Sequence, residues 1–179
     1  SLKQRFSVHP VLDKVLYYDL GCRVIRMRNR NQLLHLLLST RDAPVLYGTG
    51  GWEAWPQYRP FFRGPLEHPA EVCRLYQDSR LNLHEGVGIH FRSMDCMSAG
   101  GVLFYLASPD DDQPGGINTL FAPGEHFVSV TKENFIEQYH ELMNHPEQRK
   151  TIAQQAAREI RAHHTWEHRA AKIMADLNR

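Results

Sequence analysis

The chain has 179 residues, of which 42% are hydrophobic, and its formal net charge is +1. This length suits one domain with a buried core over residues 1–179, and the near-zero charge implies no bulk attraction to nucleic acid or to a membrane surface. No apolar run is long enough for a transmembrane helix. Cys22, Cys73 and Cys96 are widely spaced, which favours a reducing, cytoplasmic compartment over a disulfide framework or a zinc site.

The first half of the chain predicts three short strands that alternate with helices. Residues 14–19 and 44–48 are apolar runs, and residues 58–64 contain a proline, which favours a strand at the edge of a sheet. Helices are predicted over residues 31–39 and 68–77, and the second has a proline in its first turn.

Four arginines lie close together between the first predicted strand and the first predicted helix, at Arg23, Arg26, Arg28 and Arg30. This position predicts that they lie near the carboxyl edge of a parallel sheet, where ligands bind in open α/β folds. Arg28 or Arg30 would then reach a diphosphate. The alternative is a solvated or nucleic-acid-facing run of charge.

A glycine loop followed by a helix is the most informative stretch. A strand over residues 80–84 leads into Gly86 and Gly88, and the helix after them leads to a continuous apolar strand over residues 102–107. Glycines let the backbone turn tightly, and the first free N–H groups of a helix carry partial positive charge. The stretch therefore predicts a binding site for a diphosphate.

Spacing gives this helix two faces. Phe91, Met94 and Met97 recur every third residue and are expected to face the sheet, whereas Arg92 and Asp95 are expected to face the crevice. There Asp95 would accept hydrogen bonds from ribose hydroxyls. The alternative is a surface ion pair between Arg92 and Asp95, followed by an ordinary Gly-Gly terminator.

The last third of the chain predicts one more strand, over residues 126–130, and a helical tail over residues 133–143, 147–162 and 166–177. The alternation of strands and helices predicts an α/β fold. We expect a Rossmann-like, doubly wound parallel sheet of about six strands, with the site at its carboxyl edge.

Two patterns suggest a metal site, and we reject both. Residues 110–112 are three aspartates, but neighbouring prolines and glycines indicate a solvated loop. His164 and His168 are four residues apart, as zinc ligands on one helix face would be, but Thr165 between them is a helix N-cap. We expect no metal and no cofactor.

Three segments in the same order resemble CgeB-like glycosyltransferases, which are relatives of the large retaining family 4. Residues 88–101, GIHFRSMDCMSAGG, resemble the family's G-x-N-x-R-x-x-E-A-M-A-C-G-G. Residues 117–128, INTLFAPGEHFV, are similar to L-E-E-L-F-x-P-G-x-E-I-V. The segments HPEQR at residue 145 and HTWEHR at residue 164 resemble the family's H-P-E-E-R and H-T-Y-E-H-R.

The resemblance implies the C-terminal, nucleotide-sugar-binding half of a two-domain GT-B fold. An N-terminal domain would then be the partner, and it would carry the acceptor site and usually the catalytic base. The predicted donor-binding residues are Gly48, Gly50, Gly51, Trp52, Gly64, His84, Gly86, Val87, Gly88, His90, Arg92, Asp95, Ser98 and Gly100. Two of them depart from the family pattern, because Asp95 stands in place of a ribose-binding Glu and Val87 in place of another Glu.

The reaction implied is transfer of a sugar from a nucleoside diphosphate sugar, of UDP or GDP type, to an unknown acceptor. Two alternatives stay open. One is a nucleotide-sugar epimerase of the same architecture, and the other is a non-catalytic nucleotide-binding or docking module.

Overall fold

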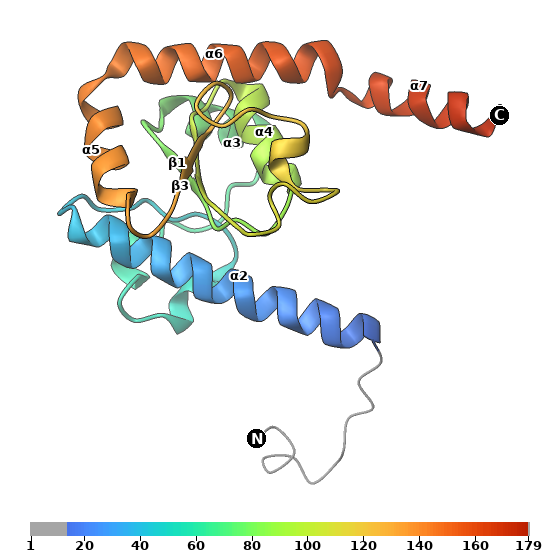
Figure 1. Ribbon diagram of the computed structural model, residues 1–179. Helices are drawn as coiled ribbons and strands as arrows, with labels where there is room; N and C mark the ends of the chain where they lie inside the picture. Colours follow the sequence, from blue (N-terminus) through green and yellow to red (C-terminus); the bar gives the residue numbers. More distant parts are fainter. Residues whose placement is uncertain (1–13, 179) are drawn as a thin grey trace, which may run out of the picture.

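The computed structural model describes residues 14–178, which form a small parallel sheet between layers of helices (Figure 1). Helices α2 and α6 lie on opposite sides of the sheet, and α5 joins the two sides (Figure 1). The elements in chain order are α2 (Lys14–Ser39), the 3-10 helices η1 (Gly50–Ala54) and η2 (Arg59–Phe61), α3 (Pro69–Asp78), β1 (Asn82–His84), α4 (Phe91–Ala99), β2 (Leu103–Leu106), η3 (Ile117–Thr119), β3 (Val128–Val130), α5 (Phe135–Asn144), α6 (Pro146–His163) and α7 (Trp166–Leu177).

The sheet has three parallel strands in the order β1-β2-β3. Leu83 of β1 lies opposite Phe104 of β2, and Phe104 lies opposite Val128 of β3. All four residues of β2 are buried, as the continuous apolar run predicts for a strand covered on both faces. An α/β fold and these three strands are confirmed, but a sheet of six strands is wrong.

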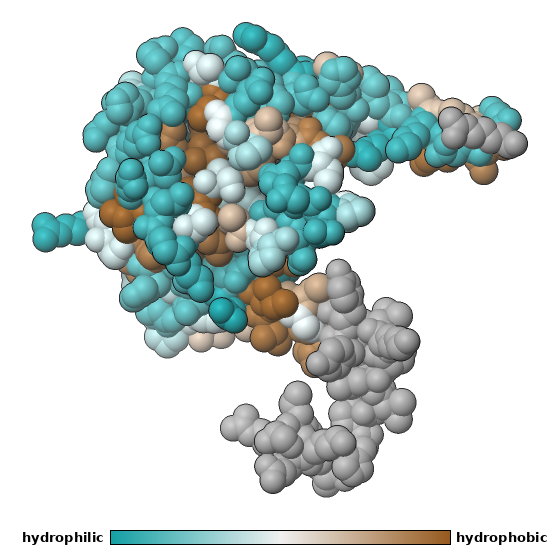
Figure 2. All heavy atoms as spheres, in the orientation of Figure 1, coloured by the Kyte–Doolittle hydropathy of each residue, from teal (hydrophilic) through white to brown (hydrophobic). Residues whose placement is uncertain are grey.

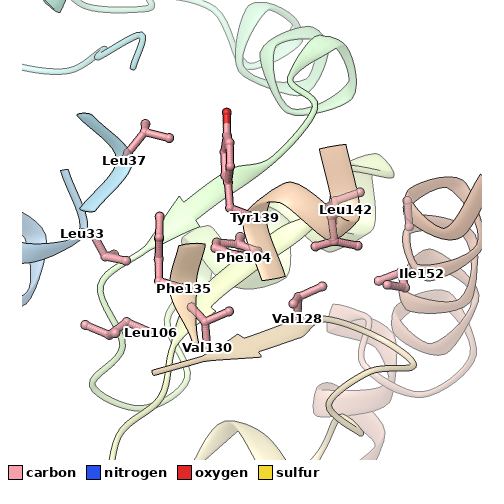
Figure 3. Close-up of a cluster of buried hydrophobic side chains, with 12 residues drawn as sticks. Leu33, Leu37, Phe104, Leu106, Val128, Val130, Phe135, Tyr139, Leu142 and Ile152 are labelled. Atoms are coloured by element: carbon pink, nitrogen blue, oxygen red, sulfur yellow. The ribbon is translucent and has the colours of Figure 1, made fainter. Parts of the chain in front are cut away.

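Alternate side chains of β2 build the two halves of the core. Phe104 and Leu106 pack with α2 and α5, and their cluster includes Leu33, Phe135 and the residues labelled in Figure 3. Leu103 and Tyr105 point to the other face, toward α4 and α6. The period of two along the strand therefore assigns α2 and α4 to opposite faces of the sheet.

Residues 43–64 form a separate unit, here called the aromatic lobe. Its only strand-like pairing is a single parallel bridge between Leu46 and Phe62. Tyr58 is buried at its centre, and its hydroxyl donates to Asn31 of α2 at 2.9 Å to the backbone oxygen and 2.7 Å to the side-chain oxygen. Within residues 14–178 no strand pairing joins the lobe to β1, so the sheet is interrupted between them.

Three of the predicted strands are wrong, and the one over residues 44–48 is reduced to the single bridge at Leu46. Residues 14–19 belong to α2, which is 26 residues long, because the helix indicated for residues 31–39 continues backward through the arginine run. A short apolar run does not by itself distinguish a strand from part of a helix. Residues 58–64 contain η2, with Pro60 in its first turn, and only Phe62 makes a bridge.

The helical tail is confirmed, with a break between α6 and α7 at Thr165, which caps α7. Helix α7 extends away from the body of the protein, as does the first part of α2 (Figure 1). Figure 2 shows hydrophobic residues on both projecting helices, and Trp166 of α7 is 87% exposed. None of the helices in residues 14–178 is long and apolar enough to cross a membrane.

Candidate functional site

A buried carboxylate surrounded by three arginines stands at the carboxyl end of β1. The Glu85 Oε1 atom lies 2.7 Å from Arg30 Nη2, 3.3 Å from Arg26 Nε and 3.3 Å from Arg92 Nη2. Asn29 also donates to the backbone oxygen of Glu85 at 2.9 Å. We call Glu85 and these arginines the arginine cluster.

Local structure explains how the arginine cluster forms. Glu85 directly follows β1, and Arg92 lies in the first turn of α4. Arg26 and Arg30 are four residues apart on α2, so they share one face of that helix. Three separate elements therefore deliver charged side chains to the same edge of the sheet.

The arginine cluster carries an excess of positive charge. Burial opposes ionisation of Glu85, which is 6% exposed, but Arg30 and Arg92 stabilise the carboxylate and hold its pKa at about 2. Glu85 is therefore ionised at neutral pH and neutralises one of three guanidinium groups. The remaining excess of two positive charges is suited to an anion, because each arginine has further N–H donors.

A cavity of about 870 Å³ opens beside the arginine cluster. It lies between the aromatic lobe and β1, where the sheet is interrupted, and residues of α2, α3, α4 and α5 contribute to its lining. Arg30, Glu85 and Arg92 line its charged part, whereas leucines such as Leu37 and Leu83 line the rest. Its size is that of a typical small-molecule site.

The turn of the aromatic lobe borders this cavity. Gly48, Gly51 and Trp52 line it, and the Arg30 guanidinium lies 5.6 Å from the centre of the Trp52 ring. The Gly48 N–H donates to the Gly64 oxygen at 3.0 Å, so two predicted residues that are far apart in sequence are brought together. Trp52 also packs against Tyr58 and thus covers the core of the lobe.

The glycine loop has an unusual backbone. Gly86, Val87 and Gly88 all have positive φ, of 75°, 79° and 73°. A Cβ on Gly86 would lie 2.3 Å from the Leu106 oxygen, so only glycine fits there. Val87 is β-branched and rarely adopts this conformation, which stores strain beside the arginine cluster.

The N-terminus of α4 is partly occupied by groups of the chain itself. His90 caps the helix, and its Nδ1 accepts from the Arg92 N–H at 3.2 Å. The Ile89 N–H donates to the Gly115 oxygen at 3.4 Å. Burial and the charge of Arg92 lower the pKa of His90 to about 4, so the cationic charge at this place comes from arginine rather than histidine.

Behind the loop lies a buried stack of rings. His84 is 4% exposed, lies flat on Tyr105 with ring centres 5.5 Å apart, and has neither ring nitrogen hydrogen-bonded within residues 14–178. Burial lowers the pKa of His84 to about 4. Tyr105 in turn donates to Asp111 at 2.9 Å and lies 3.4 Å from the Gly88 oxygen. The stacked rings therefore contact the glycine loop through the Tyr105 hydroxyl and the Gly88 oxygen.

The predicted faces of α4 are wrong in part. Ser93, Cys96 and Met97 face the core, whereas Phe91 is 68% exposed. Arg92 contacts Glu85, so the alternative of an ion pair with Asp95 is not what the structure shows.

The other predicted site residues lie outside the cavity. Asp95 is exposed and does not line it. Ser98 and Gly100 lie at the far end of α4, where Gly100 is its C-cap, and Gly50 is exposed at the start of η1. The structure does not bring these four residues together with the arginine cluster.

The residues of the two rejected metal patterns have structural partners. Asp111 is not solvated as predicted but 4% exposed, and its second oxygen accepts from the Ser108 N–H at 2.7 Å. His168 contacts the Thr165 hydroxyl at 2.8 Å, and His164 lies 3.5 Å from Glu159. Within residues 14–178 no group of three potential ligands could hold a metal ion.

Sequence reasoning missed Glu85 as the centre of the site and Arg26 as its partner. Arg26 and Arg30 are 59 and 55 residues from Glu85 in the sequence, so no local sequence pattern predicts these contacts. One signal was available: Arg26 and Arg30 have helical spacing, and a helix through residue 26 would have put both on one face. Arg28, the other candidate, is exposed and lies outside the cluster.

Comparison with known proteins assigns most of the chain to a family. Residues 28–175 match the model of a family described as glycosyl transferase-like. A search of curated proteins found no match. The matched region includes Arg30, Glu85, Arg92 and the aromatic lobe.

Proposed function

The chain belongs to the glycosyl transferase-like family, and from this premise we propose that it is the donor-binding half of a GT-B glycosyltransferase of the CgeB-like kind. It would bind a nucleoside diphosphate sugar of UDP or GDP type, and an N-terminal domain would bring the acceptor and the catalytic base. No cofactor takes part in the proposed reaction.

The arginine cluster is the observation that carries this proposal. A diphosphate has several negative charges close together, and the cluster presents an excess of two positive charges at the mouth of a cavity of about 870 Å³. Arginine forks match phosphate oxygens in geometry as well as in charge. Glu85 would hold the three side chains in place before the donor arrives.

The positions of the other parts of the donor can be inferred once the diphosphate is placed at the arginine cluster. With the diphosphate at Arg30 and Arg92, the nucleobase would lie against Gly48, Gly51 and Trp52, which line the same cavity. The N–H groups of Ile89 and Arg92 are used within the chain, so the backbone between Glu85 and Ile89 would supply any further N–H donors to the phosphates. When the sugar leaves, these fixed charges and dipoles would stabilise the developing negative charge on the diphosphate.

Calorimetric titration with UDP and GDP tests the proposal. Arg30→Ala removes the shortest contact to Glu85, and hydrogen bonds to charged groups contribute about 1.5–3 kcal/mol, so nucleotide binding should weaken at least tenfold. Arg28→Ala is the matched control, because Arg28 is exposed on the same helix and should leave binding unchanged. If neither nucleotide binds the folded protein, the proposal is wrong.

A non-catalytic binding module is the second candidate function. The position of Asp95 favours it, since an exposed carboxylate outside the cavity does not hold ribose in the observed arrangement. Asp95→Ala tests whether ribose is held as the family pattern implies, and an assay of sugar transfer to an acceptor by the protein with its N-terminal domain separates the two functions. A site that uses Asp95 loses nucleotide affinity in this variant, whereas a site that does not use it keeps the same dissociation constant. An epimerase would be recognised by the epimerised donor that it releases.

A further inference from the structure

A second groove, at the opposite edge of the sheet, is lined by a concentration of cations. Its volume is about 680 Å³. It lies between α6 and the segments that precede β1 and β2, which is the amino edge of the sheet. The arginine cluster stands at the carboxyl edge and contributes no residue to the groove, although Ser79 and Arg80 line both the groove and the cavity of about 870 Å³. The cationic residues that line the groove are Arg80, Arg149, Lys150, Arg158 and Arg161.

The charge in this groove is not balanced by the chain. Asp78 is the only acidic residue among those lining it, against five cations. Within residues 14–178 none of the five forms an ion pair with a carboxylate. The whole chain has a formal charge of only +1, so this local excess is a segregation of charge rather than a reflection of composition.

The fold holds these cations around a hollow. Arg149 is anchored, because its Nη1 donates to the backbone oxygens of Leu142 and Met143 at the end of α5. Lys150, Arg158 and Arg161 project from α6, whose small Ala153 and Ala157 also line the groove and leave room above the helix. Arg158 and Arg161 are three residues apart, a spacing at which like charges repel and destabilise a helix. A bound anion would relieve that repulsion.

We propose that this groove is a binding site for a compact ligand with several phosphate groups. Four of the five cations are arginines, whose planar forks pair with phosphate oxygens in a bidentate way. The volume is that of a small-molecule site rather than of a long nucleic-acid track. A concave groove also fits a discrete ligand better than the flat surface of a membrane.

Titration of the 179-residue chain with inorganic tripolyphosphate tests the site. The double variant Arg158→Ser with Arg161→Ser changes exposed side chains, so the fold should persist, which circular dichroism checks. We carry the double variant and the unaltered groove in the Arg30→Ala background, which weakens the donor site, and there we expect the affinity of the double variant for tripolyphosphate to fall at least tenfold. The matched control, Arg28→Ser with Lys172→Ser, removes the same charge from exposed positions outside the groove and should bind as the unaltered protein does.

Three outcomes would overturn the proposal. The first is unchanged tripolyphosphate binding by the double variant. The second is an equal loss of binding in the control, which would mean that bulk electrostatics accounts for the affinity. The third is binding to anionic phosphatidylserine vesicles that tripolyphosphate does not displace. The test is independent of the donor site. Arg30→Ala should leave the groove's share of tripolyphosphate binding intact, and the double variant should bind UDP normally.

Discussion

Arg30 of α2 and Glu85 after β1 are joined by a contact of 2.7 Å between Nη2 and Oε1, and this contact ties a helix to the strand edge that it covers. The same guanidinium lies over the Trp52 ring. Arg30 therefore connects three parts of the fold that share no strand pairing.

Replacement of Glu85 by Gln should destabilise the protein at neutral pH. The variant leaves three guanidinium groups facing one another without a carboxylate, and loss of buried hydrogen bonds to charged groups costs about 1–3 kcal/mol. Chemical denaturation measures the free energy of unfolding. Glu67→Gln, at an exposed position, should change it by less than about 0.5 kcal/mol. Equal stability of both variants would contradict a structural role for the cluster.

Stability should fall as the pH is lowered from 6.5 to 4. The pKa of His84 is lowered from 6.5 to about 4 in the folded state, mainly by burial, so in this range the unfolded chain binds the proton more tightly. His84→Phe keeps a ring against Tyr105 but cannot be protonated. Its free energy of unfolding should decline less steeply over this range, by up to about 1.4 kcal/mol per pH unit for one proton. Above pH 6.5 the two proteins should show the same slope.

Below this range Glu85 should determine the acid limit of stability. Its pKa is lowered from 4.5 to about 2, so its contribution is complete above pH 4.5 and is lost as the pH falls through 2. Acid titration followed by circular dichroism should show this loss in the unaltered protein. In Glu85→Gln the corresponding step should be missing, and a step of the same size would contradict the assignment.

Alanine at Gly86 and at Gly88 should have different costs. Both positions have positive φ, but a Cβ on Gly86 would lie 2.3 Å from the Leu106 oxygen, whereas the nearest atom to a Cβ on Gly88 is 3.7 Å away. Gly88→Ala should therefore cost about 1–2 kcal/mol for the left-handed backbone alone. Gly86→Ala should cost clearly more, because the strand must also move. Denaturant midpoints of the two variants give the comparison, and equal midpoints would argue against the close approach.

The Tyr105 hydroxyl should contribute to stability through Asp111. Tyr105→Phe removes the donor to a buried carboxylate and leaves it only the Ser108 N–H, which should cost about 1–3 kcal/mol. Tyr76→Phe is the control, because no hydrogen bond of its hydroxyl is found within residues 14–178. In thermal unfolding, the control should have a higher midpoint temperature than Tyr105→Phe. If Tyr105→Phe unfolded at a higher temperature than the control, the hydrogen bond between Tyr105 and Asp111 would not stabilise the fold.

The sequence allowed the core strands to be predicted because their signals are local. β2 is an apolar run between a Gly-Gly terminator and a polar loop, and residues 126–130 are short and apolar. Residues 14–19 give the same signal but lie in a helix. Arg26, Arg30, Leu33 and Leu37 are three or four residues apart and contact the rest of the fold from one side of α2, and the helix extends backward from them.

The candidate site could be predicted only in outline. Arg92, Trp52 and the two glycines of the loop were identified because glycine positions and helix starts are visible locally. Glu85 was not, because its meaning depends on Arg26 and Arg30 of a helix more than fifty residues earlier. Burial of Asp111 likewise depends on Tyr105, which the aspartate run itself does not reveal.

The break in the sheet between the aromatic lobe and β1 has an evolutionary consequence. The lobe contacts the remaining fold chiefly through α2, by way of Tyr58 and Trp52, rather than through a strand ladder. Changes in the length of its turns or in its ring residues can thus accumulate without disturbing the register of the three paired strands. One wall of the cavity can diverge and alter ligand preference, while the charged wall, built on α2, β1 and α4, stays constant.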